Sequence, residues 1–321
     1  MEIGLIQIDG DMPNLALMKI SAWHKKQKDN VTLMKSNVVS QRLIKFDKVY
    51  ISCIFEENNL RAKQLSKQFD NFELGGIGVN HNKLPYEIEH IMPDYDIYKC
   101  DYSMGFTTRG CIRNCEFCLV PKHEGMIKAN TDIYEFWDKR HKHLVLLDNN
   151  ILAHPKQFKK IVSQIKKEDL SVDFNQGLDI RLLREENIKL LKSIKVKPYL
   201  RFAFDKPEIE NEVIKGLELL KKYKINGSMW YILVGFNTTR EQDFRRLSIL
   251  KKYKQKPYVM RYNKCRGDLF YNDLSAWANQ QQFFASMDFE TFVKCRRDRR
   301  ELILNLSKKI GKKQKKLPIF E

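Results

Sequence analysis

Three cysteines stand close together about a third of the way along the chain. Their spacing, C-x3-C-x2-C, places three thiols on one short loop: Cys111, Cys115 and Cys118. Thiolates are soft ligands that suit iron–sulfur clusters and zinc. A closed zinc site or an ordinary [4Fe–4S] cluster takes four protein ligands, so a set of three predicts a metal group with one open coordination position.

The run around these cysteines resembles the signature of the radical S-adenosylmethionine superfamily, C-x3-C-x-aromatic-C, with Phe117 in the aromatic position. The resemblance implies that the three cysteines hold a [4Fe–4S] cluster and that S-adenosylmethionine chelates its fourth iron. It implies reductive cleavage to a 5′-deoxyadenosyl radical, hydrogen abstraction from a substrate, and a flavodoxin-like or ferredoxin-like reductant. The alternative is a zinc loop, with His123 as fourth ligand, in a nucleic-acid-binding protein without catalysis.

Downstream of the cysteines, short apolar runs alternate with helical patterns, as in parallel β/α units. Continuous apolar runs of this kind are typical of parallel strands buried on both faces. We expect strands at 102–107, 143–147, 172–175, 199–204, 229–234 and 258–262, with helices at 155–167, 185–193, 208–223 and 240–253. Six such units fit the partial (β/α)6 barrel that the resemblance implies, which we place at residues 99–264.

Polar residues follow several of these strands, at the ends where β/α barrels carry their function. By resemblance, Phe117 packs near the adenine, and further contacts to S-adenosylmethionine come from Asp148, Asn149, Gln176, Arg201 and Gly235. The segment 177–181 resembles a family segment that carries an arginine, here Arg181, after the third strand. The catalytic residue that acts on the substrate stays unknown.

Arg201 is also informative on physical grounds. Alternation along its strand puts Arg201, Ala203 and Asp205 on one face and the apolar Phe202 and Phe204 on the other. The apolar face should meet the outer helices, so Arg201 is expected inside the barrel. A buried guanidinium needs an anion, and a cofactor carboxylate or a neighbouring aspartate, at 173 or 205, would provide one.

Residues 1–98 predict a separate, small Rossmann-like α/β domain, with strands at 2–8, 48–53 and 73–79 and helices at 15–27 and 59–69. This domain order is similar to that of cobalamin-binding radical S-adenosylmethionine proteins and of methylthiotransferases. The cobalamin motif Asp-x-His-x-x-Gly is absent, so we expect no bound cobalamin. Cys53 alone stands where the methylthiotransferase domain supplies three cysteines, so no second cluster is expected.

Residues 265–321 predict a C-terminal helical extension with a basic tail. The chain carries 58 basic and 40 acidic residues, and basic runs lie at 294–300 and 308–316. This charge favours RNA as the substrate, through counterion release, with a peptide or small molecule as the runner-up. A generally lysine-rich composition with a solvated tail explains the same charge.

The sequence contains no run of eighteen apolar residues, so we expect no membrane-spanning helix. The N-terminus lacks a basic region before its apolar stretch and is not expected to be a signal peptide. Seven cysteines, three of them clustered, suit a reducing compartment, and we expect a cytoplasmic protein. Outside the cluster, Cys100 is expected to be a buried thiol, and Cys265 and Cys295 are expected to be structural thiols or, alternatively, thiols that face the substrate.

Overall fold

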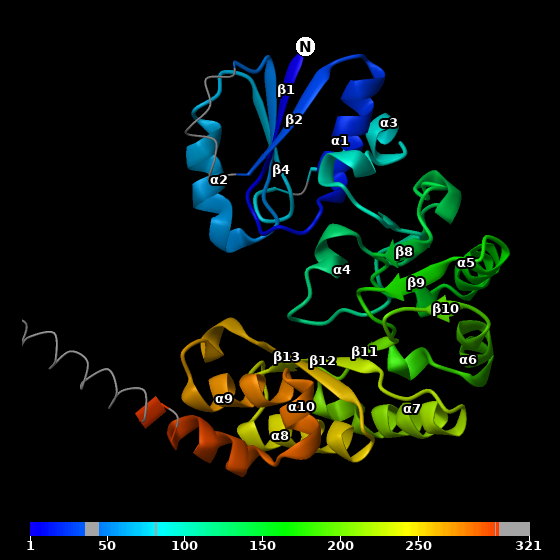
Figure 1. The fold of residues 1–321 in the computed structure, drawn as a ribbon, viewed down its shortest axis with the longest axis vertical. Helices are drawn as coiled ribbons and strands as arrows, with labels where there is room; N and C mark the ends of the chain where they lie inside the picture. Colours follow the sequence, from blue (N-terminus) through cyan, green and yellow to red (C-terminus); the bar gives the residue numbers. More distant parts are fainter. Residues whose placement is uncertain (36–44, 81, 299, 302–321) are drawn as a thin grey trace, which may run out of the picture. The chain divides into compact units, whose positions relative to one another are not determined.

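The computed structural model describes residues 1–35, 45–80, 82–298 and 300–301. The chain divides into two compact units, residues 1–200 (unit 1) and 201–321 (unit 2), and Figure 1 shows the ribbon of each. The predicted domain boundaries at 98/99 and 264/265 remain predictions. The basic tail at 308–316 lies outside the described residues.

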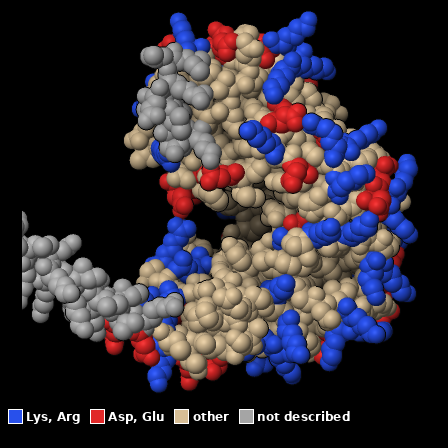
Figure 2. Space-filling model, in the orientation of Figure 1, with Lys and Arg blue, Asp and Glu red and all other residues tan. Residues whose placement is uncertain are grey.

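The surface of both units carries many basic side chains. Figure 2 shows that Lys and Arg are spread over the face in view, with Asp and Glu between them. The excess positive charge is therefore not confined to one patch of that face.

In the part of the chain that the structure describes, no helix is both long enough and apolar enough to cross a membrane.

The first part of unit 1 is a four-stranded parallel sheet in the order β2-β1-β3-β4. Its elements are β1 (Glu2–Gln7), α1 (Leu15–Lys26), β2 (Asn30–Lys35), β3 (Lys48–Ser52), α2 (Asn59–Ser66), β4 (Phe72–Gly75) and the short α3 (Tyr86–Glu89). The three predicted strands and two predicted helices are confirmed, with shorter ends. The sequence did not predict β2, a partly exposed strand at the edge of the sheet.

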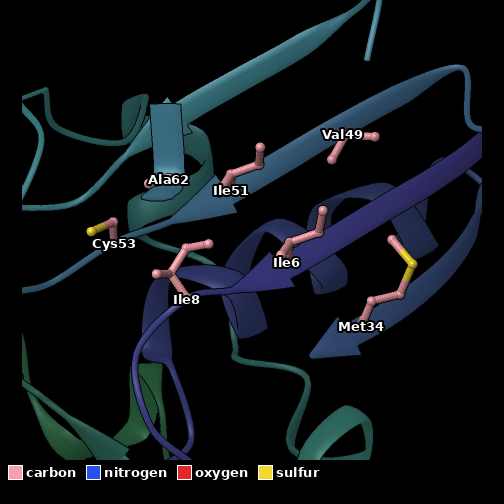
Figure 3. Packing of buried hydrophobic residues seen from close by; sticks show 7 residues of the cluster. All are labelled: Ile6, Ile8, Met34, Val49, Ile51, Cys53 and Ala62. Atoms are coloured by element: carbon pink, nitrogen blue, oxygen red, sulfur yellow. The ribbon is translucent and has the colours of Figure 1, made fainter. Parts of the chain in front are cut away.

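Both faces of this sheet are buried, as in other parallel sheets. Figure 3 shows the cluster on one face, which consists of Ile6, Ile8, Met34, Val49, Ile51, Cys53 and Ala62. The other face is covered by a second cluster made of Ile3, Leu5, Leu17, Ile20, Tyr50 and Ile88. Cys53 is therefore part of an apolar core.

The second part of unit 1 contains another parallel sheet, in the order β10-β9-β8-β5. Its strands are β5 (Ser103–Gly105), β8 (His143–Leu146), β9 (Ser171–Phe174) and β10 (Lys195–Val196), and its helices are α5 (Pro155–Lys167) and α6 (Glu185–Lys192). The cysteines lie between β5 and β8, in a segment that also holds β6 (Thr108–Arg109), α4 (Val120–His123) and β7 (Lys128–Ala129).

Tyr95 joins the two sheets of unit 1. Its ring packs in a buried cluster with Met18 from α1 and Met104 from β5. Its hydroxyl donates a hydrogen bond to Phe136 O (2.6 Å) and accepts one from Met104 N (3.1 Å). Burial raises the pKa of this phenol well above its ordinary value. Tyr95, close to the predicted domain boundary at 98/99, is therefore packed into a core that both sheets share.

Unit 2 contains a three-stranded parallel sheet in the order β11-β12-β13. Its elements are β11 (Arg201–Ala203), α7 (Glu210–Lys222), β12 (Met229–Val234), α8 (Arg240–Lys252), β13 (Lys256–Arg261), α9 (Leu269–Ala278) and α10 (Gln281–Ser286). The predicted α/β class is confirmed, but a six-stranded barrel is not, because the described strands form separate sheets in the two units. Pro198 lies between β10 and β11, and it has no N–H to donate to a strand ladder.

Candidate functional site

The three cysteines lie on a loop that is closed at its base by backbone hydrogen bonds. Cys111 N donates to Gly125 O (3.1 Å), and strands β6 and β7 pair in antiparallel fashion just before and after the loop. Gly110 has a φ of +83°, and a Cβ atom there would come within 2.5 Å of Met126 O. Only glycine allows the two sides of the loop to approach this closely.

Glu124 holds the base of the loop through three donors. Its Oε2 accepts from Gly110 N (2.8 Å) and from Asn149 Nδ2 (2.7 Å). Its Oε1 lies 3.1 Å from Nη1 of Arg109. Sequence reasoning missed Glu124, because no local periodicity marks a carboxylate whose partners lie on two other segments of the chain.

Replacing Glu124 by glutamine is expected to loosen the cysteine loop, because a glutamine amide offers one acceptor oxygen to a site with three donors. After anaerobic reconstitution with iron and sulfide, the variant should lose iron to a chelator roughly tenfold faster than the parent protein. Glu116→Gln is the matched control, since it removes the same charge from an exposed position of the same loop. Equal iron loss in the two variants would refute the role of Glu124.

Asp148 anchors the entry to the loop. Its carboxylate is buried and accepts four hydrogen bonds, from the backbone N–H and the hydroxyl of both Thr107 and Thr108. Burial raises the pKa of Asp148, while these four bonds act in the opposite direction. A carboxylate has about four lone-pair positions, so Asp148 has little acceptor capacity left for a cofactor. The structure gives it a structural role that the sequence did not predict.

Asn150 brings an amide to the first cysteine. Its Nδ2 lies 3.5 Å from Cys111 Sγ and 3.4 Å from an oxygen of Asp179. Its Oδ1 is buried and has no hydrogen-bond partner among the described residues. A buried carbonyl oxygen without a donor is costly, so this atom marks a place where a bound group could supply one.

A charged cluster lies beside the same cysteines. Asp179, which is almost fully buried, accepts from Arg181 Nε (2.7 Å) and from Arg113 Nε (2.9 Å). Burial alone would raise the pKa of Asp179, but these two arginines hold it below its ordinary value. Burial would lower the pKa of Arg181, but Asp179, with further contributions from Cys115 and Cys111, raises it. Arg181 therefore places a cation near two of the three thiols.

The donor chemistry of the loop fits an iron–sulfur group. All three cysteines are half-buried and reduced, so their thiols are neither sealed in the core nor paired in disulfides. The arrangement is not a preformed metal site, since the described residues contain no gathered group of three or more His, Cys, Asp or Glu side chains. This holds equally for a zinc site completed by His123, which lies in the short helix α4.

The remaining predicted residues of unit 1 take separate positions. Phe117 is half-buried within the cysteine loop, and Gln176 is exposed in the turn that follows β9. Gly177, next in the chain, donates its N–H to Phe174 O (3.0 Å) and so closes this turn. The contacts predicted for Phe117 and Gln176 with S-adenosylmethionine stay predictions.

In unit 2, the alternation predicted around Arg201 is confirmed. Phe202 and Phe204 are fully buried, and the ring of Phe202 packs 5.0 Å from that of Trp230. Arg201 and Asp205 are half-buried on the other face. Burial lowers the pKa of Arg201 below its ordinary value, with an opposing contribution from Tyr231. The carboxylate of Asp205 accepts from Leu233 N (2.8 Å) and so ties β11 to β12.

Gly235 occupies a tight turn after β12. Its φ is +74°, and a Cβ atom there would come 2.0 Å from Cys265 Sγ. Its N–H donates to Asp243 Oδ2 (3.0 Å). The structural reason for glycine at this position is thus the packing of Cys265, and the predicted contact with the adenine stays a prediction.

The four cysteines outside the loop differ in accessibility. Cys53 is fully buried, and burial together with nearby Asp9 raises its pKa to about 11. Burial also raises the pKa of Cys100 and of Cys265. Cys295 is exposed.

These differences predict a pattern of alkylation. In the reduced native protein at pH 8, iodoacetamide should label Cys295 and leave Cys53 unmodified, because the thiolate is the reactive form and must be reached by the reagent. The labelling of Cys53 should rise only as the pH approaches its raised pKa. Peptide mass spectrometry measures both sites, and rapid labelling of Cys53 at pH 8 would contradict its placement in the core.

No protein family matches the sequence, and no curated protein matches it. Among solved structures, the chain is similar to the apo, selenomethionine-labelled structure of OxsB, a cobalamin-dependent S-adenosylmethionine radical enzyme. The TM-score is 0.34 at 12% sequence identity, and the alignment covers 88% of this chain and 56% of that one. The chain thus spans little more than half the length of that enzyme. The function proposed below rests on the cysteine loop and the residues around it.

Proposed function

We propose that this chain is a radical S-adenosylmethionine enzyme. The proposal is carried by the C-x3-C-x2-C loop with Phe117 in its aromatic position. This loop follows the first strand of a parallel β/α sheet, and Asp148, Asn149 and Asn150 tie it to the end of the neighbouring strand β8. Function in β/α folds is concentrated at these strand ends.

Cys111, Cys115 and Cys118 would hold a [4Fe–4S] cluster through their thiolates. When bound, the cluster and S-adenosylmethionine supply a 5′-deoxyadenosyl radical for hydrogen abstraction. The chain contributes an amide donor from Asn150 to Cys111 Sγ and the positive charge of Arg181 near two thiols. Hydrogen bonds and cations beside cluster thiolates stabilise the reduced, more negative state.

Three residues of unit 1 are the proposed contacts to S-adenosylmethionine. Asn149 uses its Nδ2 on Glu124 and offers its amide oxygen to the methionine amino group. Phe117 offers a ring for the adenine, and Gln176 offers an exposed amide after β9. Asp148 is not included, because its oxygens already accept four hydrogen bonds. From unit 2, Arg201 and Gly235 remain proposed contacts.

Anaerobic reconstitution tests this proposal. The protein should bind iron and sulfide, turn brown, and form 5′-deoxyadenosine when a reductant and S-adenosylmethionine are added. A flavodoxin or ferredoxin should replace the chemical reductant. A colourless protein that holds zinc and forms no 5′-deoxyadenosine would overturn the proposal and favour a zinc-stabilised binding protein instead.

A further inference from the structure

Unit 2 contains two adjoining hollows on one side of α9. Their volumes are about 270 and 440 Å³. They share three lining residues, Arg261 at the end of β13, Ser275 on α9 and Asn279 directly after α9, so they form one continuous groove. The larger hollow is also lined by Arg296 and Arg300, which follow α10 in the sequence.

Four arginines from two parts of unit 2 line this groove. Arg261 and Arg266 come from the β13 side, and Arg296 and Arg300 from the segment after α10. Among the described residues that line the two hollows, none is acidic. A neighbouring hollow of the same unit differs, since Asp268 and Asp273 line it together with arginines. The lining of the groove therefore carries positive charge and no acidic side chain, which suits a polyanion.

The contact that the structure shows for Arg261 leaves its positive charge in place. Arg261 donates to the neutral amide oxygen of Asn272. Arg296 differs, because it lies 3.3 Å from the buried carboxylate of Asp273. Arg261 and Arg300 are exposed. The groove therefore has two exposed arginines, Arg261 and Arg300, that can pair with phosphates.

The side chains at the base of the groove exclude a peptide that binds as an added β-strand. Asn272, Ser275, Ala276 and Asn279 lie on one face of α9, at spacings of three and four residues. Asn279 bonds both backbone groups of Val259 on the edge strand β13, accepting from its N–H (2.6 Å) and donating to its carbonyl (3.1 Å). Because these edge groups are already satisfied, a peptide cannot add there as a further strand.

An aromatic platform lies beside the arginines. Tyr258 is 44% exposed and Met260 is 37% exposed, and both line the hollow that contains Arg261 and Arg266. An exposed ring next to guanidinium groups is what a single nucleic-acid strand needs, because its bases stack while its phosphates pair. Ser275 Oγ donates to Asn272 O (3.2 Å) and retains acceptor capacity for a ribose 2′-hydroxyl.

We propose that this groove binds a single-stranded segment of RNA, with phosphates on Arg261 and Arg300 and a base stacked on Tyr258. The inference rests on the proposed function in one respect, since it names the class of substrate that the radical enzyme would act on. Binding itself needs no cluster, so the two proposals can fail separately.

Fluorescence anisotropy of the full-length, reconstituted protein with a labelled, unstructured RNA of about 12 nucleotides tests the groove. Arg261→Gln combined with Arg300→Gln should weaken binding roughly tenfold at about 0.1 M salt and reduce the slope of log K against log salt by about 1.4. The matched control is Lys215→Gln with Lys221→Gln, which removes the same charge from exposed positions on α7. This control should change binding less than about twofold.

Substitutions of Tyr258 separate stacking from charge. Tyr258→Ala should weaken binding about tenfold without changing the salt slope, whereas Tyr258→Phe should bind almost normally. Equal weakening in the arginine pair and the lysine pair would overturn the proposal. Equal binding of the DNA strand of the same sequence, or full competition by polyglutamate, would also overturn it.

The cluster-free variant Cys115→Ala, measured in parallel, distinguishes this inference from the proposed function. It should bind the RNA as the parent protein does. If the parent protein binds the RNA but forms no 5′-deoxyadenosine, the proposed RNA-binding groove is supported and the proposed enzyme activity is refuted. If the parent protein forms 5′-deoxyadenosine but binds no RNA at low salt, the enzyme activity is supported and the RNA-binding groove is refuted.

Discussion

Replacing Cys115 by alanine is expected to abolish formation of 5′-deoxyadenosine and most binding of iron. Cys115 is the middle thiol of the loop and one of the two that influence Arg181. A cluster that is coordinated by three cysteines retains only two protein ligands after this change. Its stability depends on complete ligation. Product is measured by liquid chromatography, and iron and sulfide are measured on the desalted, reconstituted protein.

Cys295→Ala provides the matched control for this experiment. It removes a thiol of the same kind, but from an exposed position in unit 2. Iron content and 5′-deoxyadenosine formation should both equal those of the parent protein. Undiminished turnover in Cys115→Ala would refute the assignment of the cluster to this loop.

Replacing Arg246 by alanine is expected to lower the free energy of unfolding by about 3–5 kcal/mol, because it leaves a buried carboxylate without its counter-charge. Arg246 and Asp243 are both almost fully buried in α8. Nη2 of Arg246 donates to Asp243 Oδ1 (2.5 Å) and to Leu233 O (2.8 Å), and Nη1 donates to Phe204 O. One guanidinium thus joins α8 to the ends of β11 and β12.

Urea denaturation followed by tryptophan fluorescence measures this effect, since Trp230 and Trp277 are both buried in unit 2. Arg245→Ala is the adjacent control: Arg245 pairs with Glu210 on the surface, and loss of an exposed pair should have little effect. If Arg246→Ala does not fold, the double variant Arg246→Met with Asp243→Asn removes both charges and should recover a folded unit 2. Equal stability of the Arg245 and Arg246 variants would contradict this role.

The change at Arg246 also bears on the proposed cofactor contacts. Asp243 accepts from Gly235 N, so the buried pair holds the turn that is proposed to lie beside the adenine. Sequence reasoning missed Arg246, because a charged residue on a helix is usually solvated. Only the packing of α8 against two strand ends shows that this one is buried.

The sequence predicted well what depends on local pattern. Alternation along Arg201–Ala203 predicted its buried and half-buried faces, and apolar runs predicted most strands of both units. It predicted less well what depends on long-range pairing. Among residues 30–34 of the edge strand β2, only Met34 is buried, so the pattern of this strand was weak.

The roles of Asp148, Asn149 and Asn150 show the same limit at the site. The resemblance marked Asp148 and Asn149 as functional, but the hydrogen-bond partner of each of the three residues was set by the fold. Asp148 bonds the threonines at the loop entry, Asn149 bonds Glu124, and Asn150 lies against Cys111. Three adjacent side chains thus hold one loop at three places, which no spacing rule encodes.

The central claim is a metal cluster held by three cysteines with one iron open to S-adenosylmethionine. Electron paramagnetic resonance of the reconstituted, reduced protein, recorded with and without S-adenosylmethionine, tests it most directly. We predict the signal of a reduced [4Fe–4S] cluster whose line shape changes when S-adenosylmethionine is added. A cluster signal whose line shape does not change with S-adenosylmethionine would contradict the account. So would a protein that gives no paramagnetic signal and contains zinc in place of iron.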